Sequence, residues 1–125
     1  DNLMLFKYIL NSAQDSIFTK NPAREYTFVN PAMANLFGCR PENLLGRKPA
    51  DLFSEEDARI VNEVDDRTFN GSHVSEQRRI RIGTEMKVFH TIQSPIFDDE
   101  SRIVGICGIV RDLTEFHEFQ EKLIQ

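Results

Sequence analysis

The segment from Arg102 to Glu115 reads RIVGICGIVRDLTE, and the rest of the chain is best understood by working outward from it. Its first two-thirds is an apolar run rich in isoleucine and valine, and branching at Cβ favours a strand over a helix. Gly105 and Gly108 lie inside the run, and a glycine within a strand often marks a place where another group approaches the backbone closely. The pattern predicts a buried strand.

A helix is predicted directly after this strand. Thr114 is a favourable N-cap residue, and the sequence EFHEFQEKLIQ that follows it has charged residues at helical spacing. The chain is therefore expected to pass from a buried strand into an amphipathic helix that leaves the domain. The elements upstream would support that strand.

The composition indicates one globular domain. The chain has 125 residues, 40% of them hydrophobic and 28% charged, which is enough for a single core. No apolar run approaches the roughly 18 residues of a transmembrane helix, and no signal peptide is visible. The net charge is −5 and no long basic run occurs, so we expect neither nucleic acid nor a membrane to be a partner of this segment.

Two further features bear on the setting of the chain. It begins with Asp1 rather than methionine, which suggests a segment of a longer protein. Cys39 and Cys107 have neither the spacing of a metal site nor that of a disulfide framework, so the simplest expectation is a reducing, cytoplasmic setting. Cys107 lies in the apolar strand and is expected to pack as a small hydrophobic side chain.

Hydrophobic spacing and turn residues predict the remaining elements. Asn30 followed by Pro31 is a strong helix start, and Gly38 is a suitable end for that helix. Ser54 caps the longest predicted helix. The predicted helices cover residues 3–13, 31–37 and 55–70, with short helical turns at 41–46 and 48–53, and the predicted strands cover residues 16–19, 25–29, 74–82, 86–97 and 102–113.

This order of elements predicts an α+β fold. Strands near both ends of the sequence would form one five-stranded antiparallel sheet, with the middle helices on one face and a flanking helix at each terminus. Ile92 and Ile109 alternate away from their inward-facing neighbours, so the other face also needs cover, and the terminal helices are the candidates. A pocket is expected between the inner face and the helical middle.

Several short motifs, taken in order, resemble those of PAS domains, and the likeness covers nearly the whole chain. They are Asn30-Pro31 before a helix that ends in Phe37-Gly38, PENLLGR at 41–47, SPIFD at 94–98, IVG at 103–105 and RDLTE at 111–115. The last is similar to the family's Asp-Ile-Thr signature, with Leu113 in place of isoleucine. The resemblance implies the PAS fold.

The resemblance also implies a function. PAS domains are sensory and regulatory modules of larger signal-transduction proteins, and here a sensor histidine kinase of a two-component system is the expected parent. The boundaries would be a flanking helix at 1–14, a PAS core at 15–114 and a signalling helix at 115–125 that leads to an output domain. By the resemblance, Asp112 and Thr114 would tie the last strand to this helix and form the signal relay.

The residues that bind cofactors in some PAS domains are missing from this sequence. Cys39, in the tripeptide GCR, is followed by Pro-Glu-Asn and lies at the wrong place for a flavin-site cysteine. The long predicted helix 55–70 holds no histidine for haem, and His73 and His90 are poorly aimed. His117 lacks the proline expected after a kinase phosphoacceptor histidine. We therefore expect no haem, flavin or metal, and at most an unidentified small molecule.

The candidate ligand pocket follows from strand alternation matched to the family. Thr91 and Gln93 would be polar anchors, because a buried amide needs hydrogen-bond partners, and Gly108 would make room beside them. A packed core without a ligand fits the same residues. The predicted pocket residues are Phe28, Met33, Phe37, Leu52, Val61, Val64, Phe89, Thr91, Gln93, Ile106, Gly108 and Val110.

Two functional hypotheses remain: a domain that senses a small molecule in its pocket, and a ligand-free module for dimerisation and signal relay. An enzyme is not expected, because no nucleophile–base pair, carboxylate pair or phosphate-binding glycine loop is recognisable. We also expect a parallel homodimer through the flanking helices, where apolar residues recur three and four positions apart. The candidate interface residues are Leu3, Phe6, Leu10, Phe116, Phe119 and Leu123.

Overall fold

The computed structural model describes residues 2–124, without the side chains of Asn2, Phe6 and Lys7. The helices are α1 (Asn2–Ser12), α2 (Pro31–Leu36), α3 (Pro49–Leu52), α4 (Glu55–Phe69) and α5 (Thr114–Ile124), together with the 3-10 turn η1 (Pro41–Asn43). The strands are β1 (Ser16–Lys20), β2 (Tyr26–Val29), β3 (Val74–Ile82), β4 (Glu85–Phe97) and β5 (Ile103–Asp112). Each element expected from the sequence is present, with small differences in its bounds.

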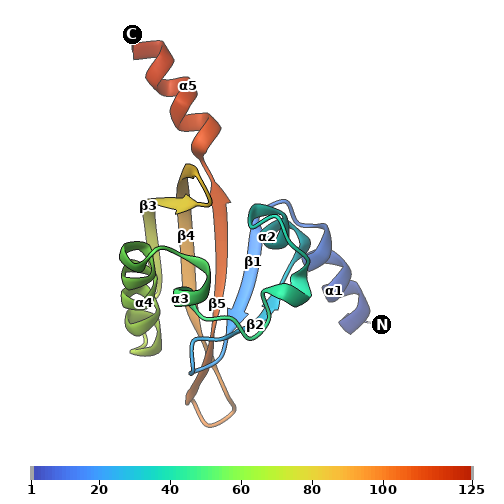
Figure 1. Cartoon of the computed structure of the whole chain (residues 1–125). Helices are drawn as coiled ribbons and strands as arrows, with labels where there is room; N and C mark the ends of the chain where they lie inside the picture. The colour runs from blue at the N-terminus through green and yellow to red at the C-terminus, as the bar shows by residue number, and fades with distance from the viewer. Residues whose placement is uncertain (1, 125) are drawn as a thin grey trace.

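The strands form one five-stranded antiparallel sheet in the order β2-β1-β5-β4-β3. β5 lies at its centre, paired with β1 on one side and β4 on the other, as its run of β-branched residues favours. Helices α2, α3 and α4 lie on one face of the sheet (Figure 1). The predicted α+β fold with helices on one face is confirmed.

Inward-facing residues of neighbouring strands lie in rows across the sheet, because side chains of paired residues point to the same face. The rows of β5 are Ile106 with Lys20 and Pro95, Gly108 with Phe18 and Gln93, and Val110 with Ser16 and Thr91. These rows form the floor of the core under the helices.

Gly108 is required by the aromatic ring that packs over it. A Cβ atom added at Gly108 would lie 2.1 Å from Cζ of Phe18, far inside van der Waals contact. Phe18 is buried in the main core cluster. The space left by the missing side chain is therefore filled by the Phe18 ring, and the expectation that Gly108 makes room for a ligand is wrong.

Strand β2 breaks the alternation on which the sequence prediction relied. Tyr26 pairs with Lys20 and Val29 pairs with Phe18, with an irregularity in the register between them. Both Tyr26 and Val29 are buried although they are three residues apart. An extra residue in one strand shifts the side-chain parity in this way. Phe28 consequently pairs with Thr19 and is turned out of the predicted pocket.

Asn30 joins three parts of the fold through one buried side chain. Its Oδ1 accepts hydrogen bonds from the backbone N–H of Met33 (3.1 Å), which confirms the predicted N-cap of α2, and of Ile17 (2.9 Å) at the start of β1. Its Nδ2 donates to the carbonyl oxygens of Leu10 (3.2 Å) and Asp15 (2.9 Å). The amide therefore fixes where the chain passes from α1 into β1.

A buried ion pair fastens α4 to the sheet. Nζ of Lys20 lies 2.7 Å from Oδ2 of Asp65, and both side chains have an exposed fraction of 0%. Nε2 of Gln93 donates to Oδ1 of Asp65 and to Oγ1 of Thr68, at 3.1 Å in each case. The Thr68 hydroxyl donates to the carbonyl oxygen of Val64. One hydrogen-bonded network thus links β1, α4 and β4.

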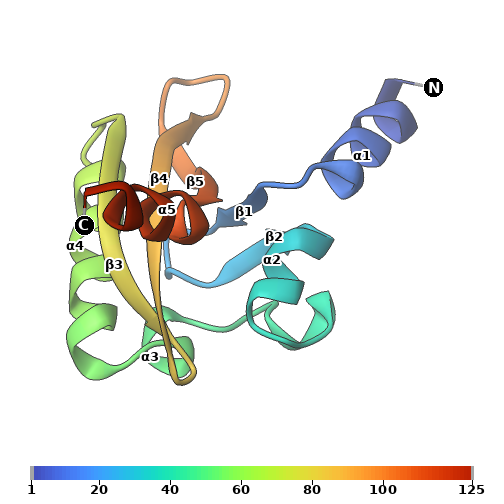
Figure 2. The same cartoon turned by 90° about the horizontal axis from the view of Figure 1, so that it is seen from above.

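The outer face of the sheet is open in the single chain. Ile92 and Ile109 are 46% and 39% exposed there. Helix α1 projects away from the sheet, and α5 continues beyond the end of β5 (Figures 1 and 2). The expectation that a terminal helix of the same chain covers these two isoleucines is therefore wrong.

The first prediction concerns the contact between Gly108 and Phe18. We expect Gly108→Ala to lower the free energy of unfolding by about 1–3 kcal/mol, because the new methyl group overpacks the core. Urea denaturation measures the change. Val104→Ala, at an exposed position of the same strand, should have little effect, and Phe18→Leu added to Gly108→Ala should restore part of the loss. An unchanged midpoint for Gly108→Ala would contradict this packing.

The second prediction concerns the buried pair. Lys20→Met leaves the Asp65 carboxylate buried without its cation, which should cost about 3–5 kcal/mol in the free energy of unfolding. The double variant Lys20→Met/Asp65→Leu should be more stable than Lys20→Met, because no unpaired charge remains. Arg59→Met, which breaks an exposed pair on the same helix, is the control and should have no measurable effect. Equal stability of the single and double variants would contradict the role of the pair.

Candidate functional site

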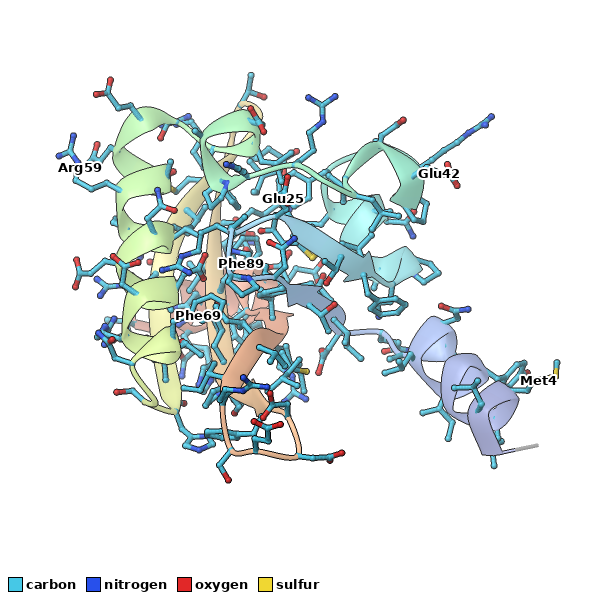
Figure 3. The ribbon with its side chains drawn as sticks, turned by 90° about the horizontal axis from the view of Figure 1, so that it is seen from below. Met4, Glu25, Glu42, Arg59, Phe69 and Phe89 are labelled. Atoms are coloured by element: carbon cyan, nitrogen blue, oxygen red, sulfur yellow. The ribbon has the colours of Figure 1, made fainter. Side chains whose placement is uncertain are left out.

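A cavity of about 80 Å³ lies between the inner face of the sheet and the helices. Figure 3 shows α4 and the strands enclosing the core side chains, with Phe89 among them. The cavity is lined by Ser16, Phe18, Lys20, Tyr26, Met33, Leu36, Phe37, Phe53, Ile60, Val61, Val64, Val74, Glu76, Arg78, Ile80, Phe89, Thr91, Gln93 and Val110. Its wall is therefore mostly aliphatic and aromatic, with a few polar side chains.

The structure brings most of the predicted pocket residues together around this cavity. Those that line it are Met33, Phe37, Val61, Val64, Phe89, Thr91, Gln93 and Val110. They come from α2 and the residue after it, from α4, and from β4 and β5. Whether they bind a ligand stays a prediction.

Four residues that were predicted in the pocket are not among the described lining residues of the cavity: Phe28, Gly108, Leu52 and Ile106. The first two are explained by the register shift and by the Phe18 ring. Leu52 packs against the core cluster while its neighbour Phe53 takes its place in the wall. Ile106 is fully buried and pairs with Lys20, which lines the cavity in this row and reaches across to Asp65 of α4.

Sequence reasoning missed the charged centre of the site. Lys20 and Asp65 were not singled out, yet both were readable from spacing. Ser16, Phe18 and Lys20 alternate along β1, so all three side chains face inward. On α4, Asp65 follows Val61 and Val64 on the apolar side of the helix, which places a carboxylate within the core. A lysine and an aspartate on two inward faces are a signal for a buried pair.

The Lys20 ammonium is surrounded by groups that stabilise its charge. Besides Asp65, it lies 4.7 Å from the ring centroid of Tyr26 and 5.4 Å from that of Phe18. Burial lowers the pKa of Lys20, and the adjacent Asp65 carboxylate opposes that shift. Burial, with a contribution from Asp65, raises the pKa of Tyr26, so its hydroxyl stays protonated. The site thus holds a cation that the protein itself already neutralises.

A second ionic cluster borders the cavity along the edge strand β3. Glu76 accepts hydrogen bonds from Arg67 of α4 through Oε1 and from Arg78 through Oε2, the latter at 3.0 Å. The bond from Arg67 and then that from Arg78 lower the pKa of Glu76, against an opposing effect of burial. Glu76 and Arg78 both line the cavity. They form a polar rim between α4 and β3.

The histidines and cysteines of the chain lie away from the cavity wall. His73 and His90 are hydrogen-bonded to Ser94 and Ser75 at 3.0 and 2.8 Å. Cys39 packs beside the core cluster, and burial raises the pKa of the half-buried Cys107 thiol. Within residues 2–124, no three His, Cys, Asp or Glu side chains are grouped so that they could hold a metal ion.

The junction between β5 and α5 is held by side-chain hydrogen bonds. Oδ1 of Asp112 accepts from the backbone N–H of Thr114 (2.9 Å) and from its hydroxyl. The Thr114 oxygen accepts from the backbone N–H of Val88 (3.0 Å), and Lys87 lies 3.8 Å from Asp112. Thr114 is the first residue of α5 rather than its N-cap, and the Asp112 carboxylate accepts from the backbone N–H of this first residue. A relay role for this junction stays a prediction.

The first turns of α5 also contact β3. Nε2 of His117 lies 2.7 Å from Nε2 of Gln77, and Arg79 lies 3.7 Å from Glu121. His117, considered as a phosphoacceptor from the sequence, is therefore engaged by the neighbouring strand. These contacts orient α5 where it leaves the core.

The candidate dimer residues are mainly at the surface. Leu3, Phe116, Phe119 and Leu123 are 76%, 56%, 61% and 70% exposed, and Leu10 is half-buried. The Phe6 side chain lies outside the described residues. In the described part of the chain, no helix has the length and apolar character needed to span a membrane.

Comparison of the sequence with known proteins supports the family. Residues 10–118 match the family model described as the PAS fold. The methanogenesis regulatory histidine kinase FilI of Methanothrix harundinacea (strain 6Ac) is 35% identical over 122 residues. That match covers 96% of this chain but only 14% of FilI.

Solved structures show the same fold at lower identity. The PAS domain of a protein from Colwellia psychrerythraea is 18% identical, with a TM-score of 0.80 over 92% of this chain and 99% of that one. An RNA-binding light-oxygen-voltage receptor is 22% identical, with a TM-score of 0.81 over 98% of this chain and 36% of that one. From the family match, the relative and the fold, the chain belongs to the PAS family.

Proposed function

We propose that the chain is the sensory domain of a larger signalling protein, a sensor histidine kinase, and that it binds a small molecule in its cavity. The observation that carries this proposal is a cavity with polar side chains set in apolar walls. The name of the relative FilI, a regulatory histidine kinase, supports a kinase as the parent protein. An output domain would then follow in the same chain.

The size of the cavity supports a small ligand. One water molecule needs about 10–15 Å³ of such space, so a site of about 80 Å³ has room for several waters or for one small organic molecule. Larger ligands would require movement of the rim or of α4. The network around Asp65 holds α4 in place and so keeps the cavity small.

The two strands behind the cavity also support a relay. β4 carries Gln93 in the cavity wall and Val88 at the junction, and β5 carries Val110 in the wall and Asp112 at the junction. A displacement of either strand by a ligand would change the bonds that hold Thr114. We propose that α5 passes this change to the output domain.

We further propose that the domain is not itself an enzyme and uses no haem, flavin or metal. The absence of histidine and cysteine from the described cavity wall supports this. Cys39 and Cys107 are both free thiols, in keeping with a cytoplasmic setting.

Association of two chains is the second proposal, and it holds with or without a ligand. Helix α1 is apolar around most of its circumference, and such a helix is stable in water when another surface covers it. The outer face of the sheet exposes Ile92 and Ile109. We propose that α1 and this face are covered in a parallel homodimer, which also brings the two α5 helices together.

The third prediction tests the ligand. Native mass spectrometry of the purified chain should show a bound small molecule, with no haem or flavin absorbance. Val61→Phe should abolish binding because the larger side chain enters the cavity, whereas Val104→Phe, on the exposed side of β5, should retain it. Protein that carries no small molecule, and that takes up none from a metabolite extract, would favour the ligand-free module instead.

The fourth prediction tests the dimer. Sedimentation equilibrium should show concentration-dependent self-association that is weakened by Ile9→Glu on α1 and by Ile109→Glu on the outer face. Asn11→Glu adds the same charge to α1 at an exposed polar position and should leave association unchanged. We do not expect α5 to hold the two chains together by itself, because eleven residues are too few for a stable helix pair. A monomer at all concentrations would contradict the dimer.

A further inference from the structure

The orientation of the Gln93 side chain is fixed by its partners. Nε2 lies near the Asp65 carboxylate and the Thr68 oxygen, and the Thr68 hydroxyl already donates its proton to Val64. Both partners can therefore only accept, so the amide nitrogen, and not the oxygen, must face them. The oxygen Oε1 points to the other side of the amide.

Oε1 of Gln93 is an acceptor without a protein donor. Gln93 is only 2% exposed, and within residues 2–124 its oxygen accepts no hydrogen bond. Among the described side chains, the one N or O atom that is both fully enclosed and unpartnered is Nε of Arg67. The Gln93 oxygen is thus not sealed off, and Gln93 is one of the residues that line the cavity. A buried amide oxygen left unpaired costs free energy, which a donor in the cavity would recover.

Two hydroxyl groups lie in the next row of the same floor. Ser16 and Thr91 flank Val110 on the neighbouring strands, and both line the cavity. Neither hydroxyl has a hydrogen-bond partner within the described chain. They can accept or donate, so they add polar contacts without demanding a charge.

The charged groups of the cavity are already paired with one another. Lys20 is held by Asp65, and Arg78 by Glu76. An anionic ligand would have to compete with Asp65 for the ammonium, and a cationic ligand would bring a second positive charge beside Lys20. The apolar remainder of the wall would leave either charge poorly solvated. These pairings favour an uncharged ligand.

We infer that the ligand is a small, uncharged molecule that donates a hydrogen bond, from a hydroxyl or amide N–H group, to Oε1 of Gln93. This rests on the proposed sensing function and adds the chemical class of what is sensed. The molecule's apolar part lies against the valine and phenylalanine side chains. Carboxylates and phosphates are excluded from the cavity, because Lys20 and Arg78 are already paired with Asp65 and Glu76.

Three probes of nearly equal shape test the two requirements, a hydrogen-bond donor and the absence of charge. They are propionamide, butan-2-one and propionate. Each is titrated into the ligand-free chain and followed by NMR at the Gln93 side-chain amide and the methyl groups of Val64 and Val110. We expect propionamide to bind about three- to tenfold more tightly than butan-2-one, the effect of one hydrogen bond. Propionate should give no saturable shift at these groups.

Two variants test whether Gln93 causes the preference for propionamide. Gln93→Leu should remove the preference for propionamide over butan-2-one, while Thr91→Val, which keeps Gln93, should retain it. Gln93→Leu also removes two donors from the α4 network, so its folding must be checked; the three probes on the unaltered chain decide the inference even if that variant does not fold.

The outcomes separate this inference from the function on which it rests. Butan-2-one or propionate binding in the cavity as tightly as propionamide overturns the donor or the charge requirement, and leaves ligand sensing intact. Failure of all three probes, together with a chain that carries no molecule when purified, overturns both. Tighter binding of propionamide supports both.

Discussion

The contact between Lys20 and Asp65 is the constraint on which the rest of this domain depends. Two charges held 2.7 Å apart with no solvent access are expensive to bury, and they are tolerated only because the carboxylate receives further hydrogen bonds and the ammonium lies beside two aromatic rings. That requirement fixes α4 against β1 and β4. The cavity lies beside the helix held in this way.

Packing is not uniform across the floor of the core. Where Gly108 meets Phe18, an additional methyl group has no room. The next row, made of Ser16, Val110 and Thr91, lines the cavity, as do Phe18 and Gln93 on either side of Gly108. A core built only for stability would close that space with larger residues. The floor therefore combines one tightly packed contact with an unfilled space.

The fold was largely predictable from the sequence, because its signals are local. The run around Gly105, the caps Asn30 and Ser54, and the alternation in β3 to β5 each specify an element from neighbouring residues. The site was predictable where the period of two holds, as at Thr91 and Gln93. The prediction was wrong at Phe28, because the alternation of apolar and polar residues does not reveal a shift in strand register. The prediction missed Asp65 although helical spacing places it on the apolar side of α4, because alternation and helical spacing show which way each residue faces but do not pair two residues that are 45 positions apart.

The hydrogen bonds of the Asn30 amide have a consequence for which side of α1 is available to a second chain. Because the amide holds the Leu10 and Asp15 carbonyls and the start of β1 together, the linker between α1 and β1 has a set length and path. Each residue added to or removed from a helix turns what precedes it by about 100° about the axis, given 3.6 residues per turn. The side of α1 that faces a given direction is therefore set by where the helix ends relative to the Asn30 amide, and relatives whose helix is one residue longer or shorter at this end would present a different side of α1.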